Sequence, residues 1–419
     1  HASWLDDLKV RAGYGTTGNS NIGAYNYAFQ YTTPTRYLYS ITGANSGASV
    51  GAGLSSLGDS GAKWETMKMF NVGLDLTAFN NKLTSSIDFY IKKTSDMLLT
   101  ANFTQLAGNA TKPNMNIGDM KNTGIDFSIG WRDKIGQVQY NINANASWYK
   151  NKVTKMGSSD LFDTTRLGNT AITTVGQPIS MFYGFVNEGI YKSAAEVTSG
   201  PLPYGVTDAA NLNAEAWVGH YKWKDVDGNG KIDDNDRTII GNPHPDLTGG
   251  FNLGLQWKDW DLSTYLYYSI GNDLYKHYEY YTLWGNLSNA YSYDRINKAW
   301  HPDTNPNGTL PLWVYGDTSA EATQSHSGYV QDGSFLRMQT LTLGYSLPKK
   351  VVNRIGFSRI RFYVQMANVF TITGYDGLDP EVRSDMGDGT GNANDMMKGI
   401  DYGSYGMPRQ YLFGVNIDF

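Results

Sequence analysis

Apolar and polar residues alternate with a period of two along much of this chain, which predicts β-strands with one apolar and one polar face. The C-terminus shows the alternation clearly. Every second residue there is aromatic or aliphatic, and these residues are Tyr411, Phe413, Val415, Ile417 and Phe419. The positions between them are Gly, Asn and Asp, with Leu412 as the exception. The last segment of the chain is therefore predicted to be a strand exposed to two different environments.

The same alternation predicts ten strands in the whole chain. They cover about residues 5–15, 67–79, 82–98, 122–132, 136–153, 249–257, 260–271, 333–347, 358–373 and 407–419. Along the clearest stretches of alternation, such as 83–92, 125–132 and 359–366, charged side chains fall almost wholly on the second face. A charge that faces lipid costs roughly 2–4 kcal/mol at the bilayer midplane, so this segregation favours strands that cross a membrane.

The connections between these strands alternate in length. The short ones are 80–81, 133–135, 258–259 and 348–357, and the long ones are 16–66, 99–121, 154–248, 272–332 and 374–406. A meander that crosses a membrane repeatedly gives this pattern, with short turns at one end and long outer loops at the other. A sandwich of Greek keys gives no reason for it. We therefore predict an all-β, antiparallel transmembrane β-barrel portion with long extracellular loops.

Tryptophans mark the ends of several predicted strands. Trp131, Trp257 and Trp260 stand beside short turns, and Trp148 stands near the far end of its strand. Indole rings favour the interfacial layer of a membrane, so these positions fit aromatic girdles. A soluble sandwich or propeller with tryptophan in its core is the alternative, but the chain shows no blade-like repeat.

Composition supports the membrane interpretation and excludes several other classes. The 419 residues include 30 Tyr, 11 Trp and 47 Gly, only 17% are charged, and the net charge is −5. The mild acidity argues against a nucleic-acid partner. The chain has no cysteine, which excludes disulfides and zinc–thiolate sites. No apolar stretch is long enough for a membrane-spanning helix, and no signal peptide opens the chain, so we expect a piece of a longer protein.

One motif predicts a metal site. Residues 225–236 read DVDGNGKIDDND and follow the calcium-loop template, with Gly230 at the sixth position, where the chain turns sharply. The predicted calcium ligands are Asp225, Asp227, Asn229, the backbone carbonyl of Lys231, Asp233 and Asp236. Ile232 is the apolar anchor, and Asp236 replaces the usual Glu. No helical pattern flanks the loop, which favours a structural ion over a sensor. An acidic Asn-Gly turn without a metal is the alternative.

No catalytic residues are predicted. The six histidines show no zinc-ligand spacing, and no phosphate-binding loop is present, so we expect no enzyme and no organic cofactor. One predicted outer loop is rich in aromatic residues, of which Tyr278, Tyr281 and Trp284 are candidates for contact with a ligand or a partner. Sugar stacking, loop packing and a partner surface all remain open for these side chains.

Several segments resemble SusC/RagA-type TonB-dependent transporters. They are residues 8–19 (LKVRAGYGTTGN), 122–126 (NTGID), 225–236, 332–337 (DGSFLR), 368–381 (NVFTITGYDGLDPE) and 408–419. The resemblance covers nearly the whole chain. It implies a 22-stranded barrel with an N-terminal plug in the outer membrane of a Gram-negative bacterium. It also implies a SusD-like surface lipoprotein as a lid, and import of oligosaccharides or peptides powered through the TonB complex.

The chain departs from that pattern, because it shows no plug, no TonB-contact segment and only ten strands. We therefore expect residues 1–419 to be the C-terminal portion of such a barrel, with loop 154–248 outside the cell carrying the calcium loop. The remaining barrel strands and the plug are expected partners. A non-transport outer-membrane barrel, such as an adhesin or a surface glycan-binding protein, is the alternative. A secreted, calcium-stabilised lectin or glycosidase is a third class.

Overall fold

The structure is a computed structural model. It describes residues 4–20, 26–33, 38–39, 49–100, 110, 114–157, 161–162, 170–284, 292–313, 320–382 and 397–419. Ten long antiparallel strands form one sheet, and each strand pairs with the next one along the chain. They are β1 (Leu5–Asn19), β6 (Glu65–Ala78), β7 (Leu83–Thr100), β8 (Asn114–Ile135), β9 (Val138–Lys155), β16 (Leu247–Trp257), β17 (Trp260–Ile270), β20 (Phe335–Ser346), β21 (Arg359–Thr373) and β22 (Gln410–Asp418). All ten predicted strands are confirmed.

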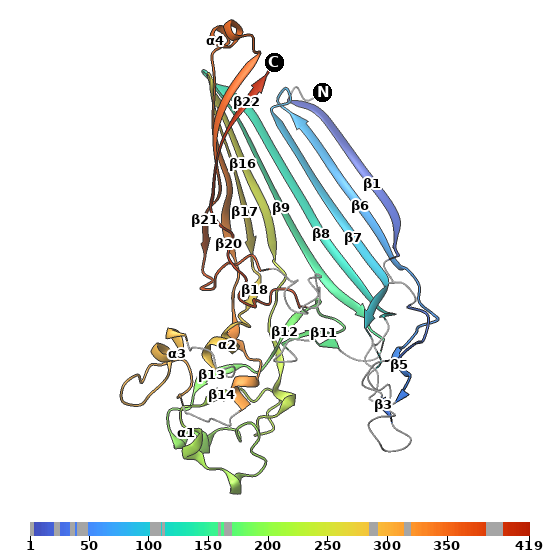
Figure 1. The fold of residues 1–419 in the computed structure, drawn as a ribbon, viewed down its shortest axis with the longest axis vertical. Coiled ribbons are helices and arrows are strands. Elements are labelled where there is room, and N and C mark those ends of the chain that lie inside the picture. Colours follow the sequence, from blue (N-terminus) through green and yellow to red (C-terminus); the bar gives the residue numbers. More distant parts are fainter. Residues whose placement is uncertain are drawn as a thin grey trace.

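Short and long connections lie at opposite ends of this sheet (Figure 1). The short turns and both chain termini lie at one end, which we call the turn end, and the long connections gather at the other, which we call the loop end. Residues 258–259 make the tight turn between β16 and β17, where Lys258 has a positive φ of 54°. The alternation predicted from connection lengths is thus confirmed as a meander.

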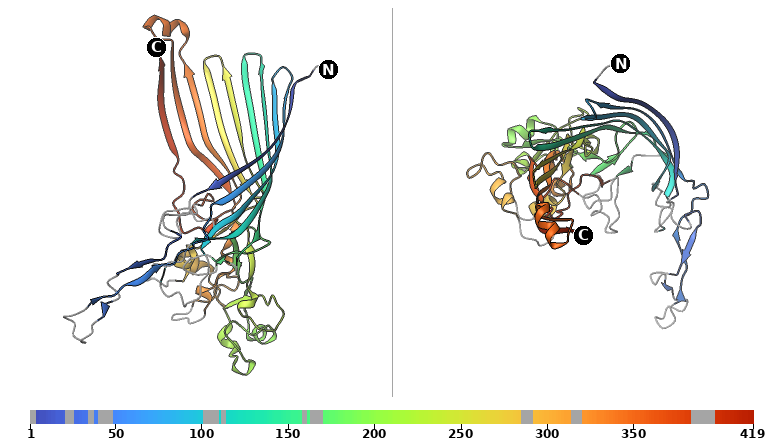
Figure 2. Two further views of the ribbon diagram at one scale, coloured as in Figure 1. Left: turned by 90° about the vertical axis from the view of Figure 1, so that its right-hand side faces the viewer. Right: turned by 90° about the horizontal axis from the view of Figure 1, so that it is seen from above.

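The sheet is curled into a trough rather than laid flat, as the view from above shows (Figure 2). β1 and β22 form its two edges. A curl of this kind is what barrel walls require. The structure is therefore an arc of a barrel, in agreement with the predicted fold class.

The two faces of the arc differ in chemistry. Cross-strand register places apolar residues in continuous rows: Leu74 pairs with Ile87, Ile87 with Phe127, and Phe127 with Ala146. Ile87 and Phe127 are 44% and 39% exposed. The opposite face is polar, as the row of Ser86 and Ser128 shows, whose hydroxyls lie 2.9 Å apart. We call the apolar side the outer face and the polar side the inner face.

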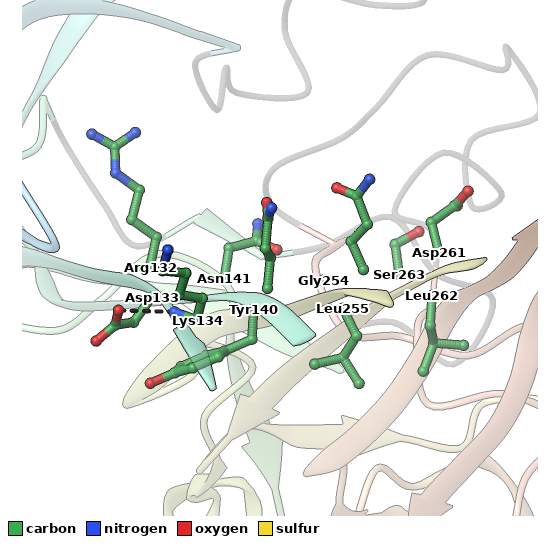
Figure 3. A pocket seen from close by; sticks show the side chains of 12 residues that line it. Arg132, Asp133, Lys134, Tyr140, Asn141, Gly254, Leu255, Asp261, Leu262 and Ser263 are labelled. Atoms are coloured by element: carbon green, nitrogen blue, oxygen red, sulfur yellow. Dashed lines mark hydrogen bonds between the residues drawn. The ribbon is translucent and has the colours of Figure 1, made fainter. Parts of the chain in front are cut away.

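Figure 3 shows this separation near the turn end. Arg132, Asn141 and Ser263 point to one side of the strands, whereas Tyr140, Leu255 and Leu262 point to the other. The hollow that these residues line takes side chains from both faces of the sheet. It therefore lies along the wall of the sheet.

The long connections fold into smaller elements. The strands are β2 (Gln30–Thr32), β3 (Leu38–Tyr39), β4 (Ser49–Val50), β5 (Gly53–Ser56), β10 (Leu161–Phe162), β11 (Ala171–Thr173), β12 (Met181–Gly184), β13 (Asn187–Ile190), β14 (Tyr221–Trp223), β15 (Thr238–Gly241), β18 (Asp273–Tyr275) and β19 (Val330–Asp332). The α-helices are α1 (Ala194–Ser199), α2 (Glu279–Leu283), α3 (Tyr293–Lys298) and α4 (Lys349–Val352). None of the helices that the structure describes is long and apolar enough to cross a membrane. The sequence patterns had predicted none of these short strands.

Two buried clusters hold the loops from 170 onward together at the loop end, and we call this unit the outer-loop body. One cluster contains Ala171, Phe182, Tyr275, Tyr329, Met397 and Ile400. The other contains Phe185, Ile190, Tyr221, Trp223, Ile232 and Trp300. Each cluster combines residues from connections far apart in sequence. Most of the fully buried large side chains of the described residues belong to this body rather than to the sheet.

Candidate functional site

The predicted calcium loop lies in the outer-loop body, between β14 and β15. Its apolar anchor, Ile232, is 3% exposed and packs in the second buried cluster. Leu202 holds the loop from outside, because its N–H donates to the Gly230 carbonyl at 3.0 Å and its carbonyl accepts from the Ile232 N–H at 2.8 Å. Gly228 and Gly230 have φ of 74° and 81°, which glycine adopts without strain. The sharp turn expected at Gly230 is confirmed.

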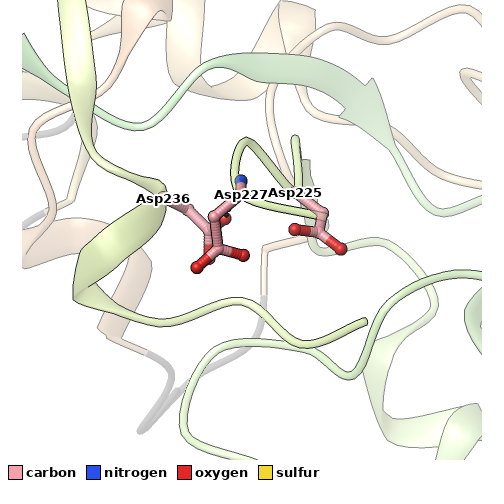
Figure 4. Close-up of side chains that lie close together, drawn as sticks. All are labelled: Asp225, Asp227 and Asp236. Atoms are coloured by element: carbon pink, nitrogen blue, oxygen red, sulfur yellow. Dashed lines mark hydrogen bonds between the residues drawn. The ribbon is translucent and has the colours of Figure 1, made fainter. Parts of the chain in front are cut away.

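Three of the predicted ligands converge. Asp225, Asp227 and Asp236 each offer a carboxylate oxygen within 4.8 Å of the other two (Figure 4). Asp236 is fully buried, and its carboxylate accepts the Val226 N–H at 2.8 Å and the Asp233 N–H at 2.7 Å. Among the described residues, no lysine or arginine forms an ion pair with any of these three carboxylates. Such a set of hard oxygen donors suits a divalent cation.

The other predicted ligands lie at the edge of this cluster. The Asn229 amide donates to Asp227 at 2.9 Å, and its oxygen accepts the Lys231 N–H at 2.9 Å. The Asp233 carboxylate pairs with Lys231 Nζ at 2.8 Å, and this bond holds the pKa of Asp233 below its usual value. Backbone N–H donation, mainly from Gly230, likewise lowers the pKa of Asp225. The structure thus gathers three ligands and leaves Asp233 bonded to a lysine.

The aromatic candidates are half-buried and make contacts within the outer-loop body. Tyr281 lies beside His277, with ring centroids 5.6 Å apart. Trp284 Nε1 donates to the Tyr329 hydroxyl at 2.8 Å, and the Arg295 guanidinium lies 5.2 Å from the Trp284 ring centroid. The Tyr278 N–H donates to the Asp401 carbonyl at 3.0 Å. These internal contacts cover part of the surface of each aromatic side chain. Contact of the remaining surface with a ligand or a partner stays a prediction.

A polar hollow opens beside these aromatics. It measures about 640 Å³, and its lining includes Lys276, Glu279, Asp294, Lys298, Gln331 and Asp376. Lys276 is 4% exposed and bonds both to Glu279 and, at 3.1 Å, to Asp376. Burial raises the pKa of the Glu279 carboxyl, although the neighbouring Lys276 opposes this shift. Both carboxylates and ammonium groups therefore line the hollow, which suits a polar ligand. Sequence spacing gave no signal for it.

A second feature that the sequence did not reveal ties the loops to the wall. Arg337 on β20 is 2% exposed and donates from Nη1 to Glu381 at 2.8 Å, from Nη2 to Asp379, and from Nε to Thr371 at 3.0 Å. Asp379 and Glu381 belong to the connection between β21 and β22. Two sequence motifs noted separately, 332–337 and 368–381, thus meet in one charged cluster. Nothing in either motif identifies the other as its partner.

Known proteins resemble this chain over its whole length. The family model described as TonB dependent receptor-like, beta-barrel matches residues 1–192. TonB-dependent receptor P3 of Formosa agariphila is 33% identical over 418 residues, which are 98% of this chain and 39% of that protein. TonB-dependent receptor SusC of Bacteroides thetaiotaomicron is 27% identical over 438 residues, 99% of this chain and 38% of that protein. The chain thus spans about two fifths of the length of these curated relatives.

Solved structures agree with this similarity. The RagAB peptide importer in its closed-closed state matches with a TM-score of 0.76 and 26% identity, over 100% of this chain and 42% of that chain. A second structure, of the RagAB peptide transporter, matches with a TM-score of 0.75 and 27% identity, over 100% of this chain and 42% of that chain. The ten-stranded arc therefore corresponds to less than half of each matched structure.

Proposed function

Because the chain belongs to the β-barrel family of the TonB-dependent receptors, we propose that it forms part of the wall and the outer loops of an energy-coupled importer in a bacterial outer membrane. The observation that carries the proposal is the two-faced meander, with apolar rows outside, polar rows inside and all long loops at one end. Such a wall separates lipid from a watery interior. The remaining strands, the plug and the contact with the TonB complex belong to the rest of the importer.

The proposed cargo is a bulky polar nutrient, either an oligosaccharide or a peptide. The polar inner face and the charged hollow in the outer-loop body both suit a ligand that carries many hydrogen-bonding groups. The matched RagAB assembly is a peptide importer. The proposed process is binding, gating and transfer without covalent chemistry.

We further propose that a SusD-like lipoprotein covers the loop end as a lid. Tyr278, Tyr281 and Trp284 lie in the outer-loop body and keep part of their surface exposed. Aromatic rings of this kind are common at the centres of protein interfaces. A structure of the complex in which all three rings face bulk solvent would contradict this assignment.

A structural calcium ion is proposed for the loop of residues 225–236. The chemistry of the donor set supports it, because three carboxylates converge and one of them, Asp236, is fully buried. Asp225, Asp227, Asn229, Asp233, Asp236 and the Lys231 carbonyl would hold the ion. Binding would require Asp233 to exchange its bond with Lys231 for the metal. The ion would neutralise the repulsion among the carboxylates and fix the middle of a long loop.

Uptake by intact cells tests the proposed function. Cells that carry the complete receptor are compared with cells that lack it, using radiolabelled oligosaccharide and peptide mixtures, with and without a protonophore that abolishes energy coupling. We expect receptor-dependent uptake of one cargo class that the protonophore abolishes. Receptor-dependent adhesion without uptake would favour the adhesin alternative. A protein recovered in the soluble fraction without detergent would favour the secreted lectin or glycosidase.

A further inference from the structure

Four lysines form a row across four neighbouring strands of the sheet, and we call this row the lysine ladder. In the cross-strand register, Lys68 on β6 is the partner of Lys93 on β7. Lys93 is in turn the partner of Lys121 on β8, and Lys121 is the partner of Lys152 on β9. Neighbouring strands lie about 4.8 Å apart, so the ladder is about 14 Å wide. Four strands thus present one ammonium group each along a single line.

The ladder lies on the outer, apolar face of the wall. Side chains two residues apart on a strand share a face, and two positions nearer the turn end the register places Phe70, Ile91, Thr123 and Lys150. The next row on the same face is Val72, Phe89, Ile125 and Trp148. Lys68, Lys93, Lys150 and Lys152 are exposed, and Lys121 is half-buried. The ladder therefore continues the face that we assign to lipid, but with charge.

The height of the ladder matches the edge of a membrane. Near the turn end, Leu83 on β7 is the partner of Trp131 on β8, which marks the aromatic girdle there. Lys93 follows Leu83 by ten residues on β7. At about 3.4 Å per residue and a strand tilt of about 40°, that separation gives about 26 Å of height. The apolar band of a transmembrane barrel is about 25 Å tall. The ladder thus lies where hydrocarbon ends and the headgroups on the loop side begin.

The protein provides little counter-charge for this row. Like charges that are directly opposite each other destabilise a sheet, yet none of the ladder lysines forms an ion pair with another described residue. The carboxylate that follows on the same face of β8 is Asp119, whose Oδ1 accepts the Asp96 N–H at 3.0 Å. Lys150 Nζ lies 5.9 Å from the Trp148 ring centroid, an interfacial arrangement. An anionic layer outside the protein would attract all four ammonium groups and so offset the repulsion among them.

The basic patch is confined to one side of the arc. At the loop end of the strands β17, β20, β21 and β22, the outer face carries Ile270, Leu336, Ile372 and Tyr411. Ile270, Ile372 and Tyr411 are 48%, 62% and 61% exposed. The ladder is therefore a local feature of β6 to β9, and a general need for solubility at the rim does not explain it.

We propose that the lysine ladder binds the phosphate groups of lipids in the outer leaflet of the membrane. This inference rests on the proposed function, because it requires the sheet to span the membrane with its long loops outside. Lysine ammonium groups at a membrane edge attract anionic headgroups, while their aliphatic stems lie along the apolar surface. A phosphorylated lipid fits both the charged row and the apolar surface beside it. Its phosphates contact the ladder, and its acyl chains cover Phe70, Val72 and Phe89. A free phosphate ion would use only the charges.

Lipid binding to the purified complete receptor tests the proposal. The probes are diphosphorylated lipid A, the same lipid after enzymatic removal of its phosphates, and inorganic phosphate, each titrated in a nonionic detergent and followed by native mass spectrometry. The test variant combines Lys68→Gln, Lys93→Gln, Lys121→Gln and Lys152→Gln. The control variant removes the same charge at the turn end through Lys134→Gln, Lys258→Gln, Lys349→Gln and Lys350→Gln. A charge-preserving variant replaces the four ladder lysines with arginine.

Each lysine removed should weaken lipid A binding roughly fivefold, so we expect the four-site ladder variant to bind lipid A at least a hundredfold more weakly than the wild type. The control and arginine variants should bind like the wild type, and the attraction should weaken at high salt. If the variant with four substitutions does not assemble, the double variant Lys93→Gln/Lys121→Gln is compared with the wild type instead. Equal binding by ladder and control variants would overturn the proposal, as would equal competition by inorganic phosphate. Cell fractionation of the wild type distinguishes failure of the lipid-binding proposal from failure of the proposed function. If the wild-type receptor were absent from the outer membrane, the proposed function itself would be contradicted.

Discussion

Arg11 on β1 reaches across the whole width of β6 to bond Asp88 on β7, with 2.8 Å between Nη2 and Oδ2. The same guanidinium bonds Asp75 on β6 through two contacts of 2.7 and 2.8 Å. Gly73 makes the crossing possible, because a Cβ atom there would lie 2.8 Å from Arg11 Nη2 and 2.3 Å from Asp88 Oδ1. The absence of a side chain at Gly73 thus lets the Arg11 side chain connect three strands.

Gly73→Val is therefore expected to displace the Arg11 guanidinium and destabilise the wall at its β1 edge. Overpacking of this kind costs about 1–3 kcal/mol. The midpoint of thermal unfolding, followed by the heat-dependent gel mobility of the complete receptor in detergent, measures the loss. The effect should shrink in an Arg11→Ala background, since the obstructed side chain is then already gone.

Gly13→Val is the matched control. Gly13 lies on β1, two residues beyond Arg11, and nothing stands within 4 Å of a Cβ atom built there. Both substitutions place the same β-branched side chain on the inner face of a strand. Equal losses from Gly73→Val and Gly13→Val would mean that the crossing arginine contributes nothing.

The assignment of faces gives a second prediction. Ile87→Arg and Phe362→Arg should impair outer-membrane assembly much more than Ser86→Arg and Gln365→Arg do, because only the first pair places charge in hydrocarbon. Ile87 and Phe362 are 44% and 46% exposed on the outer face. A lipid-facing arginine costs about 2–4 kcal/mol at the midplane. The yield of folded receptor in outer-membrane fractions measures the effect, and equal yields for both pairs would show that the faces are misassigned.

The strands were predictable from sequence because lipid and water act on alternate residues of the same segment. Where both faces of a strand are in water, the alternation of apolar and polar residues ends although the strand continues. This explains why β8 begins at Asn114, whereas the alternation predicted a start near residue 122. The short strands of the outer-loop body are buried by contacts between distant loops. Their pattern, such as the wholly buried Ala171–Thr173, is therefore not periodic. A single sequence carries no record of those contacts.

The candidate sites divide in the same way. The convergence of Asp225, Asp227 and Asp236 could be predicted because all three lie within one short segment, where sequence spacing restricts geometry. The ladder and the bond from Arg337 to Glu381 join residues separated by 25 or more positions. They exist only once the cross-strand register or the loop packing is known. Local chemistry was therefore readable from the sequence, and chemistry across strands was not.

Acidification is expected to loosen the outer-loop body. His277 is fully buried among the rings of Tyr280, Tyr281 and Tyr402, and neither ring nitrogen has a hydrogen-bond partner in the described part of the chain. Burial lowers the pKa of His277 from 6.5 to about 4. The unfolded loop therefore binds a proton more readily than the folded one. The stability that neutral His277 contributes is complete above pH 6.5 and is lost as the pH falls toward about 4, by about 3 kcal/mol.

Hydrogen exchange of peptides from residues 273–284 and 397–404, measured between pH 7.5 and 4, follows this loss. His277→Phe keeps an aromatic ring but has no titrating group, so it should remove most of the pH dependence of hydrogen exchange. A remainder is expected from His326, whose pKa burial lowers to about 3. His301→Phe, at a half-exposed position, should leave the dependence as in the wild type. An unchanged pH profile in His277→Phe would assign the loosening to other groups.

Calcium binding to residues 225–236 gives the last prediction. Asp225, Asp227 and Asp236 bring three carboxylates within 4.8 Å of each other, and their repulsion favours an open loop unless a cation lies between them. Calcium should therefore slow hydrogen exchange of the peptide 221–241, and a chelator should reverse the effect, whereas magnesium at equal concentration should act weakly because it requires a tighter octahedron.

The substitution Asp227→Asn tests whether the carboxylates themselves hold the ion. It should raise the calcium concentration needed for half-maximal protection at least tenfold, since one charged ligand is lost. Asp234→Asn removes the same charge from the same loop at a position outside the ligand template, where the side chain is 75% exposed, and should leave the midpoint unchanged. In crystals grown with calcium, six or seven oxygens should surround the ion at about 2.3–2.6 Å, with Asp233 released from Lys231. Equal shifts in both variants, or an Asp233 still bonded to Lys231 at saturating calcium, would reduce the motif to an acidic turn that binds no metal.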